Sequence, residues 1–254
     1  MKKFYLYAPN SPNVHNDTCA YLPEIKNKKI IAISPHADDI AIACGGTLAI
    51  LSATNIITPI LFFTGHRGVD TSTRAEAIAL REKEMTCEAK ILNIQAPVFL
   101  RLASYENDNQ ETIIRDITHV TRELEKQNPE IIFLPWQHDS QPRHQLASIM
   151  AQAALKKTNL SPTLFFYETT WRQFGALDFN VGFILDEHIM TKKLQAIRAH
   201  QSQLERTAFD VAAQNLARLR AVTVPEQRIQ GYGHQTTQVH IPYLEVFLKR
   251  RLKS

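Results

Sequence analysis

Short apolar runs alternate with longer amphipathic segments along most of this chain. Apolar runs bounded by charged, Pro or Gly residues are typical of buried strands, and they occur at 29–34, 56–63, 97–102, 131–134, 164–168 and 179–185. Segments of helical character occur at 44–54, 74–91, 112–127, 145–157, 187–204 and 207–220. This alternation predicts βαβ units, and therefore an α/β fold with a mainly parallel sheet flanked by helices on both faces.

Nothing in the sequence divides the chain. We find no internal repeat, low-complexity tract or Gly/Ser linker, so we expect a single domain over residues 1–254. The composition, 44% hydrophobic and 21% charged, is not that of a long disordered or collagen-like chain. No apolar stretch approaches the roughly 20 residues that span a bilayer, and the apolar start is too short for a signal peptide. Three widely spaced cysteines without a CxxC pair favour a cytoplasmic location.

The charge balance argues against a nucleic-acid partner. Twenty-nine basic and 25 acidic residues give a formal net charge of +4, whereas nucleic-acid-binding proteins normally carry a larger and clustered excess. Much of the excess lies near the C-terminus, in Lys249, Arg250, Arg251 and Lys253. We interpret this basic segment as the solvated end of a helix.

His and Asp residues cluster where two of the predicted strands end. Residues 34–39 (SPHADD) follow the first strand of the series, and residues 135–144 (PWQHDSQPRH) follow the strand at 131–134. Because ligands bind beyond the carboxyl ends of parallel strands, these clusters mark the place to look for chemistry.

The two clusters can supply a metal site. Imidazole and carboxylate are ligands of mixed N/O divalent sites, and His36, Asp39 and His144 would form a set of three. Three protein ligands leave a position open for water or substrate, and Asp38 would lie beside the metal as a proton acceptor. The alternative is that these aspartates only cap a helix or interact with its dipole.

Five short motifs resemble one family. Residues 35–39 (PHADD) with 45–48 (GGTL), 81–84 (REKE), 139–144 (DSQPRH) and 199–203 (AHQSQ) are similar, in order, to the landmarks of the LmbE-like, or PIG-L, N-deacetylases. The resemblance implies a Rossmann-like fold holding Zn²⁺, with Fe²⁺ as the alternative metal. It also implies removal of the acetyl group from an N-acetylglucosamine-type amino sugar or glycoconjugate, a small-molecule substrate.

The resemblance assigns roles residue by residue. His36, Asp39 and His144 would bind the metal, and Asp38 would take a proton from a metal-bound water and return it to the leaving amine. Arg81 matches a family position that contacts substrate, with a surface ion pair as the alternative. His200 lies in the last motif, where we expect a hydrogen-bonding role in substrate binding. His66 and Arg67 make one wall of the predicted pocket basic.

The chain departs from the family pattern at four positions, and two of them affect the chemistry. Gln141 and Arg143 replace a His that stabilises the oxyanion and an Asp that orients it; Ala37 and Ile40 replace a Pro and a Glu. We expect Gln141 to donate one hydrogen bond in place of the His, and Arg143 to supply positive charge there or to bind an anionic part of the substrate. Loss of one oxyanion donor costs about 10²–10³ in rate, so we predict weakened rather than abolished catalysis.

Two rival functions remain open. A non-catalytic metal- or sugar-binding protein on the same scaffold would account for the Gln141 and Arg143 changes. Phosphoester hydrolysis would suit the basic strand ends, although phosphoesterases often use paired metals. Among other candidates, we expect Gly45 and Gly46 to allow close packing and Trp136 and Trp171 to form a core or pocket-wall pair. The segment 231–234 is a predicted loop near the site, and the sequence sets no oligomeric state.

Overall fold

Nine strands form one mixed sheet in the computed structural model, which describes residues 4–7, 19–70, 73–224 and 241–251. The order across the sheet is β2-β1-β8-β9-β7-β6-β3-β4-β5. The strands are β1 Phe4–Tyr7, β2 Cys19–Tyr21, β3 Lys29–Ser34, β4 Ile56–Leu61, β5 Val98–Phe99, β6 Ile131–Pro135, β7 Thr163–Tyr167, β8 Val181–Leu185 and β9 Tyr243–Arg251. Neighbouring strands are parallel except where β9 pairs with β7 and β8.

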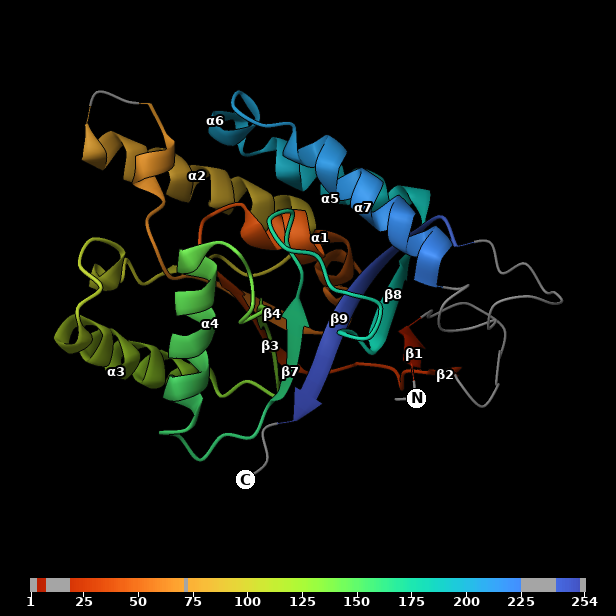
Figure 1. Cartoon of the computed structure of the whole chain (residues 1–254), viewed down its shortest axis with the longest axis horizontal. Coiled ribbons are helices and arrows are strands. Elements are labelled where there is room, and N and C mark those ends of the chain that lie inside the picture. The colour runs from red at the N-terminus through yellow and green to blue at the C-terminus, as the bar shows by residue number, and fades with distance from the viewer. Residues whose placement is uncertain (1–3, 8–18, 71–72, 225–240, 252–254) are drawn as a thin grey trace, which may run out of the picture.

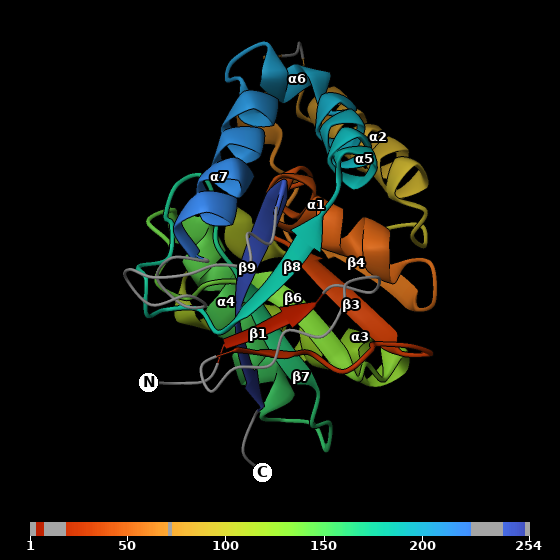
Figure 2. The ribbon, with the colours of Figure 1, turned by 90° about the vertical axis from the view of Figure 1, so that its right-hand side faces the viewer.

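Helices cover both faces of this sheet (Figures 1 and 2). They are α1 Asp39–Leu51, α2 Arg74–Leu92, α3 Gln110–Gln127, α4 Pro142–Leu155, α5 Glu187–Arg198, α6 Gln201–Leu204 and α7 Phe209–Val224, with 3-10 turns η1 His66–Gly68 and η2 Ala103–Tyr105. Alternate side chains of β3 point to opposite faces: Ile31 and Ile33 pack with α3 and α4, and Ile30 and Ala32 pack with α1. The predicted fold class, a mainly parallel sheet between two helical layers, is confirmed.

The strand order creates a switch point between β3 and β6. From β3 the chain proceeds to β4 and β5 on one side, and then returns to β6 on the other side. Helices on the two sides therefore leave a crevice at the carboxyl ends of β3 and β6, which is where ligands bind in open α/β sheets. The two His/Asp clusters emerge at these two strand ends.

Two of the predicted helices differ from the observed ones. The first begins at Asp39 rather than at Cys44, because Cys44 (φ −138°, ψ 15°) is a kink that joins two helical pieces. The helix predicted over 187–204 is broken after Arg198, and His200 (φ −92°, ψ 60°) precedes the short α6. The second break lies in the motif at 199–203, and the kink at Cys44 directly precedes the Gly pair.

Lys249, Arg250 and Arg251 lie in strand β9, so the interpretation of this segment as a helix end was wrong; Lys253 lies outside the described residues. In β9 the side chains of Tyr243, Glu245 and Phe247 belong to one face, and Leu244 and Val246 to the other, and all five are buried. Burial on both faces removes the polar alternation that marks a half-exposed strand. Pairing with β7 and β8 fills the gap between them, and that long-range pairing is absent from any local pattern.

The Gly pair at 45–46 serves close packing, as predicted. A Cβ atom at Gly46 would lie 2.4 Å from Leu185 Cδ1, whereas one at Gly45 would have its nearest neighbour, Lys193 Cγ, at 3.4 Å. No helix in the described ranges is both long and apolar enough to cross a membrane. The predicted loop at 231–234 lies outside the described residues.

Candidate active site

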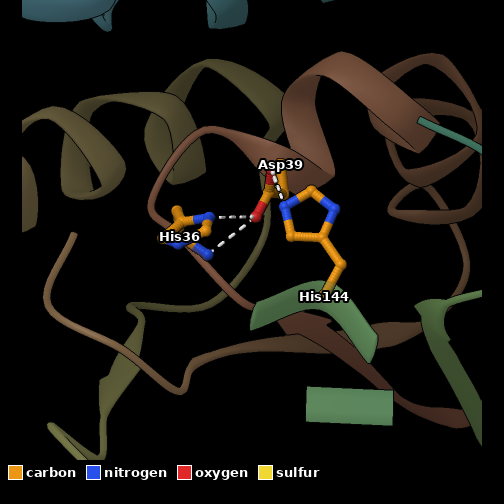
Figure 3. Close-up of side chains that lie close together, drawn as sticks. All are labelled: His36, Asp39 and His144. Atoms are coloured by element: carbon orange, nitrogen blue, oxygen red, sulfur yellow. Dashed lines mark hydrogen bonds and ion pairs between the residues drawn. The ribbon is translucent and has the colours of Figure 1, made fainter. Parts of the chain in front are cut away.

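Three side chains from the two His/Asp clusters converge at the β3–β6 crevice. One ligand atom from each of His36, Asp39 and His144 lies within 4.8 Å of the others. Asp39 is central: its Oδ2 is 3.2 Å from His36 Nδ1 and its Oδ1 is 3.2 Å from His144 Nε2. Figure 3 shows both rings turned toward this carboxylate. The turn between β3 and α1 sets the geometry, because the backbone N–H of His36 donates to Asp39 Oδ2 at 2.7 Å.

The orientation of the His144 ring tests whether a metal ion fits. His144 lies in the first turn of α4, and its Nδ1 is 3.1 Å from Asp139 Oδ2. A carboxylate only accepts, so Nδ1 carries the hydrogen and donates it. Nε2, buried and without a hydrogen-bond partner among the described residues, is then the ligating atom and faces Asp39. A His whose second nitrogen donates to a carboxylate is the usual arrangement around a protein-bound metal ion, so these residues fit one.

Without a cation, a proton on the His144 ring balances part of the negative charge of the neighbouring carboxylates. Burial by itself would lower the pKa of His144, but the Asp39 and Asp139 carboxylates raise that pKa to about 10. Burial by itself would raise the pKa of Asp39, but the His144 and His36 rings hold it well below its usual value. The site is therefore built for positive charge at its centre.

Asp38 lies beside the three ligands and is held by Arg81. Its side chain is buried, and Arg81 Nη2 donates to Asp38 Oδ1 at 2.5 Å. Burial opposes ionisation of Asp38, but the Arg81 guanidinium, together with His200 and His36, lowers the pKa of Asp38. Arg81 in turn lies 3.5 Å from Glu84 Oε2, and Glu84 accepts from the backbone and hydroxyl of Ser202. This buried chain of contacts ties α2 and α6 to the carboxylate.

A cavity of about 260 Å³ opens over these residues. Of the predicted site residues, His36, Asp38, Asp39, Arg67, Arg81 and Gln141 line it, and His144 lies beneath them with 1% exposure. Gln141 is the N-cap of α4: its Oε1 accepts from the backbone N–H groups of Arg143 and His144. Its position in the cavity wall agrees with the expectation that this side chain faces the substrate.

Three predicted residues are placed outside the cavity wall. Arg143 donates to the Ser104 carbonyl at 2.9 Å and pairs with Asp108 at 3.1 Å, so its guanidinium is engaged by these two groups. His66 lies between Thr64 Oγ1 at 2.7 Å and Glu106 at 3.1 Å. His200, 1% exposed, bonds Glu88 at 2.7 Å. Apart from Thr64, the partners of these residues are distant from them in the linear sequence, and buried His200 contacts α2 through Glu88.

Other residues of the site went unassigned at the sequence level. Asp139, 1% exposed, accepts from His144 Nδ1, from the Gln141 backbone at 2.8 Å and from Thr169 Oγ1 at 2.6 Å. Its position five residues before His144 was the signal in the sequence that could have identified it as a site residue. Tyr105 lines the cavity with its ring centre 6.2 Å from that of His36, and no motif marks it. The two tryptophans are not a pair: Trp136 is buried against Phe174, whereas Trp171 lines the cavity.

The sequence matches one family model and is similar to two deacetylases. The PIG-L family model, described as GlcNAc-PI de-N-acetylase, matches residues 31–155. The chain is 30% identical to the uncharacterized deacetylase YaiS of Escherichia coli over 181 residues, which cover 70% of this chain and 92% of that protein. It is 27% identical to the diacetylchitobiose deacetylase of Thermococcus kodakarensis over 211 residues, or 72% of this chain and 73% of that protein.

The fold is also found in an enzyme with a different activity. The crystal structure of a 4-carboxy-2-hydroxymuconate hydratase from Pseudomonas putida superposes with a TM-score of 0.68 and 18% identity, over 89% of this chain and 96% of that one. Fold alone therefore does not assign the reaction, and the residues in the crevice must do so.

Proposed function

Because this chain belongs to the PIG-L family of deacetylases, we propose that it is a metal-dependent hydrolase that removes the acetyl group from an N-acetylated amino sugar or glycoconjugate. One observation carries the proposal: His36, Asp39 and His144 present their ligand atoms together, with the Asp38 carboxylate beside them in the same cavity. His36, Asp39 and His144 would hold the metal, Zn²⁺ or Fe²⁺. We also propose one domain for the whole chain and, from its sparse cysteines, a cytoplasmic location.

The chain's own residues can carry the proton transfers of amide hydrolysis. When bound, a divalent ion polarises the acetyl carbonyl and lowers the pKa of water. Asp38 accepts the proton of the attacking water as the new C–O bond forms. The C–N bond then breaks, Asp38 returns the proton to the leaving nitrogen, and the products are acetate and the free amine.

Arg81 and Gln141 complete this arrangement. Arg81 keeps Asp38 ionised in a buried position, which makes the carboxylate available as a base but also a weaker one. Gln141 lines the cavity, and its amide Nε2 would donate to the oxyanion while its Oε1 caps α4. One neutral donor is a modest substitute for a cationic one, so we expect slow turnover.

The test combines metal content with acetate release. Protein purified without added metal is analysed for Zn and Fe, beside a His144→Ala variant, and acetate is measured with a panel of neutral and charged N-acetylated sugars. We expect about one ion per chain in the parent, little in His144→Ala, and acetate release that Asp38→Asn abolishes while metal is retained. Full activity in Asp38→Asn would refute the assigned base.

The second candidate is a metal- or sugar-binding protein without turnover. It is favoured by Arg143, whose guanidinium is bound to Ser104 and Asp108 and therefore does not replace the missing charge. Stoichiometric metal and sugar binding, with no acetate from any substrate of the panel, would support it over the deacetylase.

A further inference from the structure

Trp171 is an exposed aromatic side chain at the rim of the cavity. It follows β7, lines the cavity and is 54% exposed, whereas Trp136 is 8% exposed. The floor residues Asp38 and Asp39 are each 6% exposed. The rigid ring of a Trp, apolar on its faces and with one N–H donor, offers a large contact area to a ligand that leaves the cavity on this side.

The backbone that carries Trp171 is fixed before any ligand arrives. Its carbonyl accepts from Ser140 Oγ at 2.8 Å, and its N–H donates to Thr169 Oγ1 at 3.3 Å. Thr169 Oγ1 also donates to Asp139, the residue that orients His144. The backbone of Trp171 is thus held at a set position relative to His144, which limits the conformational entropy lost when a ligand binds there.

The indole already contacts one aromatic neighbour. The rings of Trp171 and Phe209 meet edge to face at 6.1 Å between centres and an interplanar angle of 72°. With Ile42 they form the apolar part of the cavity lining, and Thr170, Gln203 and Arg67 provide polar groups in the same lining. A pyranose ring has apolar C–H faces and a polar edge, which this mixture suits, whereas an acyl chain would need a continuous apolar groove.

The size of the cavity decides how much of a substrate lies inside. At about 260 Å³ it is smaller than the roughly 300–1,000 Å³ that encloses a drug-sized ligand. It therefore has room for the one N-acetylated ring that must reach Asp38. Anything attached to that ring has to leave through the mouth, where Trp171 is exposed.

We propose that Trp171 is the stacking platform for a second pyranose ring, so that the substrate is an N-acetylated oligosaccharide of at least two rings. The substrate assignment rests on the proposed deacetylase function, but the ring-binding role of Trp171 does not require turnover. Trp171 determines specificity, and Asp38 remains the base.

Two measurements test this, and only one needs catalysis. The first follows tryptophan fluorescence of Asp38→Asn, which stops turnover, during titration with N-acetylglucosamine or N,N′-diacetylchitobiose. Only two tryptophans are present and Trp136 is buried, so a blue shift reports on Trp171. We expect the shift with the disaccharide, little with the monosaccharide, and none in the same background with Trp171→Phe.

The second measurement is kcat/KM for deacetylation of both sugars and of an octyl N-acetylglucosaminide. Trp171→Ala should lower the disaccharide value about 10-fold and leave the monosaccharide value within about twofold. Leu177→Ala, an exposed apolar residue of the same connection (75% exposed), is the matched control and should change neither.

The outcomes separate the two proposals. A disaccharide-specific shift without acetate release from any sugar would refute the deacetylase and support the Trp171 platform. Acetate release from both sugars that Trp171→Ala leaves unchanged, or lowers equally, would overturn the platform alone. Preference for the octyl glycoside, or no shift with either sugar, would also overturn it.

Discussion

Asp139→Asn should weaken metal binding although Asp139 is not one of the three proposed metal ligands. The carboxylate is 1% exposed and accepts three hydrogen bonds, from His144 Nδ1, Thr169 Oγ1 and the Gln141 backbone. Asparagine has almost the same shape but offers one acceptor oxygen and one N–H₂ donor. One of the buried donors must therefore lose its acceptor.

Both orientations of the new amide are unfavourable. With its N–H₂ toward His144, the ring must move its hydrogen to Nε2, the atom that faces Asp39 and would bind metal. With its N–H₂ toward Gln141, the part-buried backbone N–H of that residue is left unpaired, which costs about 1–3 kcal/mol. Since 1.4 kcal/mol corresponds to a factor of ten, this range agrees with the roughly 10–100-fold loss of affinity typical when a carboxylate behind a metal-binding His is changed.

The assay is competition for Zn²⁺ with a chromophoric chelator, with circular dichroism to confirm folding. Thr169→Val is the matched control: it removes one donor and leaves the carboxylate that orients His144, so its metal affinity should fall less than that of Asp139→Asn. Unchanged affinity in folded Asp139→Asn would show that the Asp139 contact does not fix the His144 ring.

Three further predictions concern packing, catalysis and pH. Gly46→Ala should lower the free energy of unfolding by about 1–3 kcal/mol in urea, because its Cβ would overlap Leu185 and overpack the core; Gly45→Ala should cost less, and equal losses would contradict the packing argument. Gln141→Ala should lower the free energy of unfolding by about 1 kcal/mol, because a helix cap is lost, and should lower kcat at least tenfold. Asn109→Ala, which removes the α3 cap, should lower only the stability. An unimpaired kcat in Gln141→Ala would exclude Gln141 as the oxyanion donor. In the metal-free protein the folded pKa of His144 is about 10 against a reference value of 6.5, so its protonation stabilises the fold fully below about pH 6.5 and that contribution is lost as pH rises through 10. Urea unfolding in the presence of a chelator should show this loss of stability, and His144→Gln should remove it. An unchanged dependence of stability on pH in that variant would assign the effect to another group.

Much of the fold follows from local pattern. β3, β4, β6 and β7 are apolar runs long enough to be buried on both faces, and the helices between them carry their own stop signals, such as Asn128 and Pro129 after α3. Among the elements that the pattern missed, β1 and β9 pair with strands far away in the sequence, and β2 is an edge strand that pairs with β1. A strand without a recognisable local pattern is stabilised by its neighbours, and only the assembled sheet supplies them.

The sequence by itself determined which residue types gather at the crevice. Once β3 and β6 are parallel, the residues that follow them must meet at one edge of the sheet, and this brings His36, Asp39 and His144 together.

Only the tertiary structure decided what each charged side chain contacts. Arg143 and His200 are as close to the motifs in sequence as the ligands are, yet Ser104, Asp108 and Glu88 hold them outside the cavity wall. Trp171, in a segment without a motif, reaches the rim because β7 ends beside β6. Hydrogen bonds and ion pairs act over a few ångströms, so the choice among partners is made by packing between segments that are distant in the sequence.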